Sequence, residues 1–98
     1  MHARVTTMRM DPGRVDEVAR TLENDDIPGF RELDGFKGLT VLADRGSGKT
    51  VAVSFWESED ALTASEEAVK GARQRAAERG GAPDLEIERF EVVLDTMA

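Results

Sequence analysis

The sequence contains no cysteine and a single histidine among its 98 residues. Without cysteine the chain has no disulfide bond, no thiolate metal site and no thiol nucleophile. The one histidine, His2, stands at the N-terminus, where a lone histidine is more often solvated than catalytic. We therefore predict that the protein has no metal site.

The sequence also lacks a long apolar run and an excess of basic residues. No stretch approaches the roughly 20 apolar residues of a membrane-spanning helix, and the first ten residues lack the charged-then-apolar order of a secretion signal. Acidic residues outnumber basic ones 20 to 13, and the net charge of −7 opposes binding to nucleic acid or to anionic membranes. We expect a cytoplasmic protein with neither of these partners.

The chain length predicts one domain, spanning residues 1–98. A chain of this size buries only about 60–70% of its unfolded surface, so its own hydrophobic core is modest. A partner subunit would therefore add to its stability.

The middle of the chain is the stretch around which the other elements can be arranged. Two runs rich in Val, Leu, Thr and Phe, Leu39–Ala43 and Thr50–Trp56, flank the Gly-rich segment Asp44–Lys49. This pattern predicts a β-hairpin. The letters GSGKT do not predict a phosphate-binding loop, because Ala43 stands where that motif needs glycine and Thr50 begins a strand instead of a helix.

The segment before the hairpin predicts a strand, a helix and a loop. Ala3–Met10 alternates with the period of a strand. Asp11 is an N-cap signal followed by proline, and apolar spacing then predicts a helix to about Glu23. The sequence NDDIPGFRELDG, Asn24–Gly35, is rich in Asp and Gly and predicts a structured loop. Three apolar side chains are expected to hold it down: Ile27, Phe30 and Leu33.

The segment after the hairpin predicts one helix and one strand. Ser58 is an N-cap signal with acidic residues in the following turn, and Gly80 and Gly81 are stop signals. Leu85–Leu94 reads as a strand whose alternation changes phase, which predicts a bulge or bend near Arg89. The predicted helix has one face of small residues: Ala61, Ser65, Ala68, Ala72 and Ala76. Such a face either packs closely against the sheet or leaves room above it.

The order of elements, β-α-β-β-α-β, predicts an α+β fold of the ferredoxin-like type with a four-stranded antiparallel sheet. Two helices cover only one face of such a sheet. The other face is also apolar, since neighbouring residues of opposite parity, such as Phe55 and Trp56, are both hydrophobic. We therefore expect a second copy of the chain to cover it, in a homodimer.

One face of the predicted sheet carries polar groups in an apolar layer, which is typical of a small-molecule pocket. Arg4 and Thr6 share a face of the first strand, and Ser54 shares a face of the hairpin with Trp56. We predict a pocket bordered by these residues. The alternatives are that Arg4 reaches solvent, that Thr6 is only a strand former and that Trp56 serves only packing.

Arg73, on the predicted second helix, is a further candidate for binding an anionic or phenolate ligand. The alternative is a solvated helix face, on which Arg73 and other basic residues oppose glutamates. The acidic pairs Asp25/Asp26 and Glu66/Glu67 lack the spacing of a general acid/base couple or a calcium loop, and are interpreted as surface. No catalytic residue can be nominated.

The segment GFRELDGFKGLTVLADRGSGKTVAVSFWESEDAL resembles the antibiotic biosynthesis monooxygenase (ABM) domain of the dimeric α/β-barrel superfamily. It has a Leu-x-Gly-Phe-x-Gly turn, a strand ending in Trp56, a Ser- and acid-rich cap and an Ala-Leu pair. The resemblance extends from Arg4 to Leu94. It implies the same fold and a homodimer. It also implies oxidation of aromatic polyketides by O2 with no metal or organic cofactor.

Departures from the family pattern bear on the activity. Haem-degrading members use an Asn, a Trp and a His where this chain has Thr6, Ser65 and Arg73, which argues against haem degradation. Quinone-forming members also use Tyr and Asn side chains, whereas this chain has no Tyr and its one Asn lies in the predicted loop. Two hypotheses follow: a cofactor-independent monooxygenase, or a non-catalytic small-molecule-binding or stress-related protein of the same fold. An isomerase or lyase is a third possibility, for which the sequence offers no acid/base residue.

Overall fold

A computed structural model describes residues 1–97 of the chain. The strands are β1 (His2–Arg9), β2 (Phe36–Ala43), β3 (Lys49–Trp56) and β4 (Leu85–Glu91), and the helices are α1 (Val15–Thr21), α2 (Ile27–Phe30), α3 (Glu59–Ala64) and α4 (Glu66–Gly80). A 3-10 turn, η1 (Pro12–Arg14), precedes α1, and a π-helical turn, η2 (Leu22–Asp26), joins α1 to α2. Across the described residues, no helix combines the length and apolarity needed to cross a bilayer.

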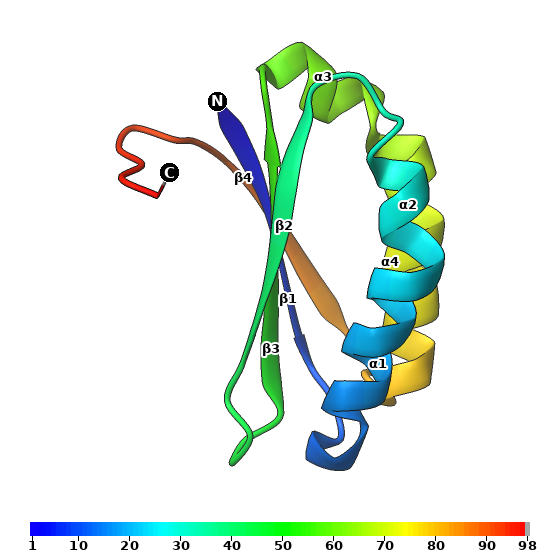
Figure 1. Cartoon of the computed structure of the whole chain (residues 1–98). Coiled ribbons are helices and arrows are strands. Elements are labelled where there is room, and N and C mark those ends of the chain that lie inside the picture. Colours follow the sequence, from blue (N-terminus) through cyan, green and yellow to red (C-terminus); the bar gives the residue numbers. More distant parts are fainter. Residues whose placement is uncertain (98) are drawn as a thin grey trace.

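The four strands form one antiparallel sheet in the order β2-β3-β1-β4, with α1, α2 and α4 packed on one face (Figure 1). This confirms the predicted ferredoxin-like α+β fold. In the register of β1 with β3, Arg4 pairs with Ser54 and Thr6 pairs with Ala52. Paired residues point to the same side of a sheet, so the predicted grouping of Arg4, Thr6 and Ser54 on one face is correct.

Local signals predicted most element ends correctly. The Asp11 side chain accepts a hydrogen bond from the Gly13 N–H at 2.9 Å, and Ser58 Oγ accepts one from the Ala61 N–H at 3.1 Å. Gly81 adopts a left-handed conformation at the end of α4, with φ of 72°. These are the contacts that terminate helices locally, so they are visible in sequence.

The prediction of a loop beginning at Asn24 is wrong, because the chain stays helical to Phe30. In η2 the Ile27 N–H donates to the Leu22 carbonyl, five residues back, so the wider π turn carries the chain across the polar segment. Pro28 then falls in the first turn of α2, where its missing N–H costs nothing. Phe30 is buried as expected, and burial of its ring helps to stabilise this continuation.

The second predicted helix is divided at Ser65 into α3 and α4. Its predicted face of small residues is only partly correct, because Ala68 is exposed while Leu62 and Val69 are buried. The buried face is rotated by about one position toward these larger apolar side chains. Their burial removes more apolar area from water than burial of alanines would.

Of the bulge or bend predicted near Arg89, the bulge is wrong. β4 pairs with β1 in continuous register, and the irregularity lies in β2, between Phe36 and Gly38. Beyond Leu85, β4 is an exposed edge strand, so Ile87 and Phe90 are both partly in water. Where neither face of a strand is buried, the alternation of apolar residues does not determine how the strand pairs with its neighbour.

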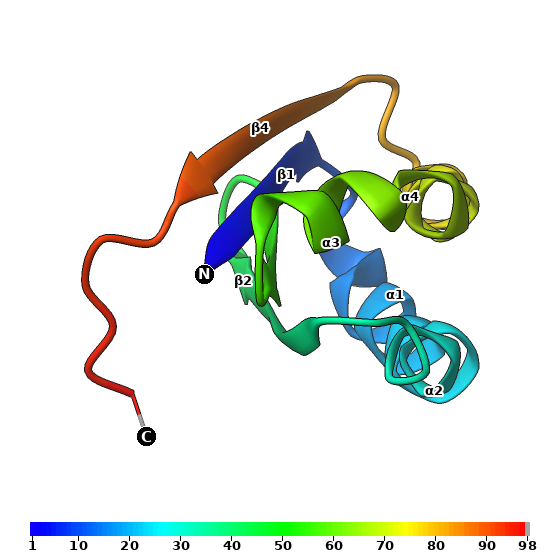
Figure 2. The same ribbon diagram turned by 90° about the horizontal axis from the view of Figure 1, so that it is seen from above.

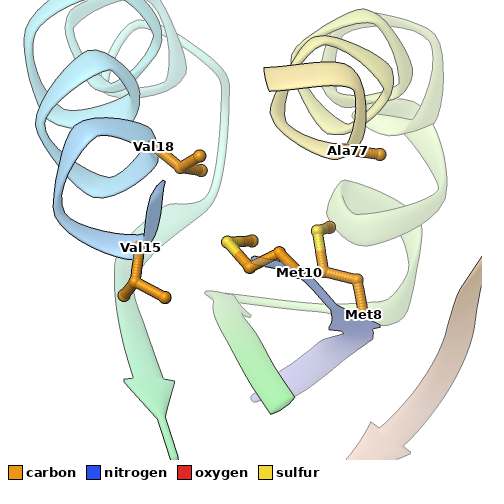
Figure 3. Packing of buried hydrophobic residues seen from close by; sticks show 5 residues of the cluster. All are labelled: Met8, Met10, Val15, Val18 and Ala77. Carbon is orange, nitrogen blue, oxygen red and sulfur yellow. The ribbon is translucent and has the colours of Figure 1, made fainter. Parts of the chain in front are cut away.

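Two clusters of buried residues form the core between the sheet and the helices. In Figure 3, Met8 and Met10 project from the end of β1 into the space between α1 and α4. The first cluster consists of Met8, Met10, Val15, Val18 and Ala77. The second consists of Phe30, Trp56, Leu62, Val69 and Ala72. The candidate site lies beside this second cluster.

The opposite face of the sheet is not covered by any element of the described chain (Figure 2). The register places Val53 and Phe55 on it, together with Leu42, which is 54% exposed, and Phe90, which is 50% exposed. The segment after β4 runs away from the helices in both views (Figures 1 and 2). The face is therefore apolar and open, as the sequence predicted.

Candidate functional site

All five residues predicted to bind a ligand line one cavity between the sheet and the helices. They are Arg4, Thr6, Ser54, Trp56 and Arg73. The cavity has a volume of about 60 Å³, and apolar side chains from β2, α2 and α4 complete its walls. The five residues grouped from the sequence are therefore also grouped in space.

Small side chains on both sides create this space. On the sheet, Ala52 and Ser54 lie side by side with Thr6 and Arg4 of β1. On α4, Ala72 and Ala76 face them across the cavity. The small face of the helix thus leaves room above the sheet, which is the outcome that the sequence left open.

Trp56 lines the cavity at the end of β3, with 0% of its surface exposed. Its indole N–H donates to Ser54 Oγ at 2.9 Å, and its ring meets Phe36 edge-on with centroids 5.2 Å apart. A buried indole needs such a hydrogen-bond partner. Trp56 therefore packs in the core and also presents one surface to the cavity.

Arg4 is 1% exposed, so the alternative that it reaches solvent is wrong. Its Nη2 donates to the Leu62 carbonyl at 2.9 Å and to Ser65 Oγ at 3.2 Å, and lies 2.9 Å from Glu66 Oε2. The break between α3 and α4 positions these acceptors, because Leu62 lies in the last turn of α3 and Ser65 is the residue between the helices. The Arg4 guanidinium carbon also lies 5.9 Å from the centroid of the Trp56 ring, within the range of a cation–π contact.

Glu66 forms ion pairs with two buried guanidinium groups at once. Its other carboxylate oxygen lies 2.7 Å from Arg73 Nη2, and Arg73 is 9% exposed, which excludes the solvated-face alternative. The hydrogen bond from Arg73 is the main cause that holds the pKa of Glu66 below its usual value, while burial lowers the pKa of Arg4. Two cations share one anion, so the Arg4–Glu66–Arg73 group carries a net positive charge at the cavity.

Three buried N–H-bearing atoms of this group have no hydrogen-bond partner in the described part of the protein. They are Nε and Nη1 of Arg4 and Nη1 of Arg73. A buried guanidinium N–H that lacks an acceptor costs free energy, and in native proteins nearly all such groups are satisfied. Arg4 and Arg73 line the cavity, so an occupant with acceptor oxygens, above all an anionic one, would satisfy those N–H groups that it reaches.

Glu66, which the sequence predicts to lie on the surface with Glu67, is only partly exposed and pairs with both buried arginines. A detectable signal was present, because Glu66 precedes Arg73 by seven residues and two helical turns place both on one face. Asp26 was misassigned in the same way. Its side chain is 9% exposed and lies 2.7 Å from Arg75, which joins η2 to α4. No spacing rule predicts this pair, because its members lie 49 residues apart.

The family model for antibiotic biosynthesis monooxygenase matches residues 1–78. The chain belongs to this family. Among the curated relatives of this ABM protein is the uncharacterized protein Rv2558 of Mycobacterium tuberculosis, 39% identical over 77 residues, which are 79% of this chain and 33% of the relative. The chain spans between a third and two fifths of the length of the curated relatives that it matches.

Two solved structures have the same fold as this ABM protein. A monooxygenase from the gene ActVA-Orf6 of Streptomyces coelicolor, in complex with nanaomycin D, has a TM-score of 0.79, 18% identity, and coverage of 99% of this chain and 91% of its own. The heme-degrader MhuD of Mycobacterium tuberculosis, with two hemes bound in its active site, has a TM-score of 0.73 and 23% identity. The match covers 99% of this chain and 100% of MhuD. At these identities the likeness concerns the fold.

Proposed function

We propose that this ABM protein binds a small aromatic or polyketide-type molecule as its phenolate or enolate and oxidises it with O2, using no metal or organic cofactor. The observation that supports the proposal is the cavity beside Trp56, which is lined by Arg4 and Arg73; these two cations share the single anion Glu66, so the group carries a net positive charge. A positive charge next to an acidic hydroxyl lowers the pKa of that hydroxyl and so favours the anion. Membership of the ABM family agrees with this chemistry.

The reaction balances without a further reductant. An anthrone-type CH2 group loses two hydrogens and gains one oxygen to become a carbonyl, while the second oxygen atom of O2 leaves as water. The substrate therefore supplies all four electrons. The role of the protein is to desolvate the anion against Trp56, to hold it with Arg4 and Arg73, and to exclude competing water.

Oxygen uptake with a panel of hydroxylated anthrones and quinols tests the activity. We expect uptake by the native protein and a loss of at least about tenfold in Trp56→Phe and Arg4→Ala, because a misplaced or unpaired anion loses transition-state stabilisation. Arg20→Ala is a matched control, because Arg20 is exposed on α1 and does not line the cavity. Uptake that survives both cavity variants would reject the site assignment.

The second candidate function is small-molecule binding without catalysis, for example in a stress response. It is favoured by the absence of tyrosine from the chain and by the position of Asn24, its one asparagine, which is exposed in η2 and does not line the cavity. Trp56 is the only tryptophan, so its fluorescence reports on the cavity directly. Quenching by an aromatic ligand with no oxygen uptake from any quinol would favour this function over oxidation.

We also propose that two copies pack through their open sheet faces. The support is the uncovered apolar face, which includes Leu42, Phe55 and Phe90. A lone chain would leave this face in water, and large exposed apolar patches on stable proteins mark interaction sites. Sedimentation of the protein at micromolar concentration tests this. A stable monomer would contradict the homodimer.

A further inference from the structure

A second hollow adjoins the cavity at the β2 edge of the sheet. It is a groove of about 570 Å³ between β2 and the helical segment formed by α1, η2 and α2. Leu22 of η2 and Leu39 of β2 line both the groove and the cavity. These two side chains therefore stand at the boundary between the two spaces.

The sizes of the two spaces show why they belong together. Ligand pockets commonly measure about 300–1,000 Å³. The cavity of about 60 Å³ is too small for a fused aromatic ligand, whereas the adjoining groove of about 570 Å³ is within that range. Rotation of Leu22 and Leu39 away from their boundary would join the two spaces into one that is large enough for the ring system.

The charge of the groove is opposite to that of the chain. Arg31 and Lys37 line it together with one acidic residue, Glu23, so its local net charge is positive, whereas the whole chain carries −7. Neither Arg31 nor Lys37 forms an ion pair with any other described residue. Their charges are therefore available to an external anion.

Backbone irregularities form both walls of the groove. Lys37 is the extra residue at the register shift between Phe36 and Gly38, and Gly38 takes a φ of 145° there. In a regular strand, Lys37 would point away from the face that Phe36 occupies. The bulge instead lets both Phe36 and Lys37 line the groove. Bulges and π turns recur beside functional sites because they redirect side chains, and the opposite wall here contains the π turn η2.

We propose that the groove is both the entrance to the cavity and an outer subsite, in which Arg31 and Lys37 bind a carboxylate substituent of the ligand. The aromatic part then lies in the joined space that Leu22 and Leu39 open toward the cavity. This inference rests on the proposed function of the cavity. It narrows the ligand class to aromatic molecules with an acidic hydroxyl on the ring system and a carboxylate at the opposite end.

Binding of a dihydroxyanthraquinone carboxylate and of its methyl ester tests the outer subsite, with quenching of Trp56 fluorescence as the readout. We expect the native protein to prefer the carboxylate by about five- to tenfold, which is the size expected for two exposed ion pairs. The double variant Arg31→Ala/Lys37→Ala should bind both compounds equally. Lys70→Ala, which removes an exposed charge on α4 outside the groove, should keep the preference.

The outcomes separate the two proposals. If the ester quenches Trp56 but the double variant keeps the native preference for the carboxylate, the outer subsite is wrong while binding in the cavity stands. If neither compound quenches Trp56, the proposed function fails and the subsite fails with it. Circular dichroism verifies that each variant is folded, which is expected because both substituted side chains are exposed.

Discussion

Arg4 carries a positive charge at a position from which almost all water is removed. Transferring such an ion out of water costs several kcal/mol, so the site requires partners. The Leu62 carbonyl, the Ser65 hydroxyl and the Glu66 carboxylate supply them through one nitrogen, Nη2, whereas Nε and Nη1 have no partner among the described residues. Because a guanidinium stays protonated in proteins even when burial lowers its pKa, Arg4 is a permanent positive charge.

Substitution of Glu66 tests this charge balance. Glu66→Gln leaves two buried guanidinium groups without an anion, and we expect the free energy of unfolding to fall by about 1–3 kcal/mol. This is less than the 3–5 kcal/mol of a fully buried pair, because the Glu66 side chain is 43% exposed and partly screened. Urea unfolding at neutral pH measures the change. Glu67→Gln, at the neighbouring exposed position, should change stability by less than about 0.5 kcal/mol.

The same carboxylate gives stability a predictable pH dependence. Its pKa in the folded protein lies below the usual value of 4.5, so its stabilising contribution is complete above that pH and is lost as the pH falls through the folded-state pKa. The midpoint temperature of thermal unfolding should therefore decrease as the pH falls below 4.5. In Glu66→Gln this decrease should be smaller, and an identical decrease in both proteins would contradict the assignment.

At the scale of elements, local chemistry predicted the strands, the hairpin and the helix caps, but not the course of the chain from Asn24 to Phe30. Asn, Asp, Pro and Gly are loop signals in isolation. Here the π turn and the position of Pro28 reconcile them with a helix, and the ion pair of Asp26 with Arg75 ties the segment to α4. Propensity is a weak guide where tertiary contacts of this kind compensate for it.

The hairpin turn offers a test at this scale. Gly48 has φ of 80°, and its carbonyl accepts a hydrogen bond from the Met10 N–H at 2.9 Å. A Cβ at this position would overlap the Met10 carbonyl oxygen. We expect Gly48→Ala to lower the free energy of unfolding by about 2–4 kcal/mol, through backbone strain and steric overlap.

Gly29→Ala is the matched control for Gly48→Ala. Gly29 lies in α2 with a helical φ, and a Cβ there meets nothing within 4 Å. This substitution should be neutral or stabilise the protein by up to about 1 kcal/mol, because alanine favours helices. Equal destabilisation of both variants in urea unfolding would show that the turn geometry is not the cause.

At the scale of the whole molecule, the helices and core clusters lie on one side of the sheet and the open apolar face lies on the other (Figure 2). The sequence indicated this arrangement, because adjacent hydrophobic residues of opposite parity occur in the central strands. The residues after β4 include Val93 and Leu94, which are highly exposed. Both features agree with the proposed pairing of two copies.

Leu42 tests that pairing. Leu42→Asp places a charge within the proposed interface, where its desolvation is costly, so the dissociation constant of the dimer should rise by at least about tenfold. Sedimentation equilibrium over a range of concentrations measures it. Ala68→Asp, on the exposed side of α4, should leave dimerisation unchanged. If the Leu42→Asp variant dimerises as tightly as the native protein, the interface lies elsewhere.

The sequence by itself determined which residues share a face of the sheet, because side chains alternate along a strand whatever surrounds it. It also determined the helix caps and the turn glycines, which depend on neighbours in the chain. Only the tertiary structure decided that Arg4 and Arg73 share Glu66 and that the cavity meets the groove at Leu22 and Leu39. These features depend on distances between segments far apart in the sequence, and packing of the whole chain sets those distances.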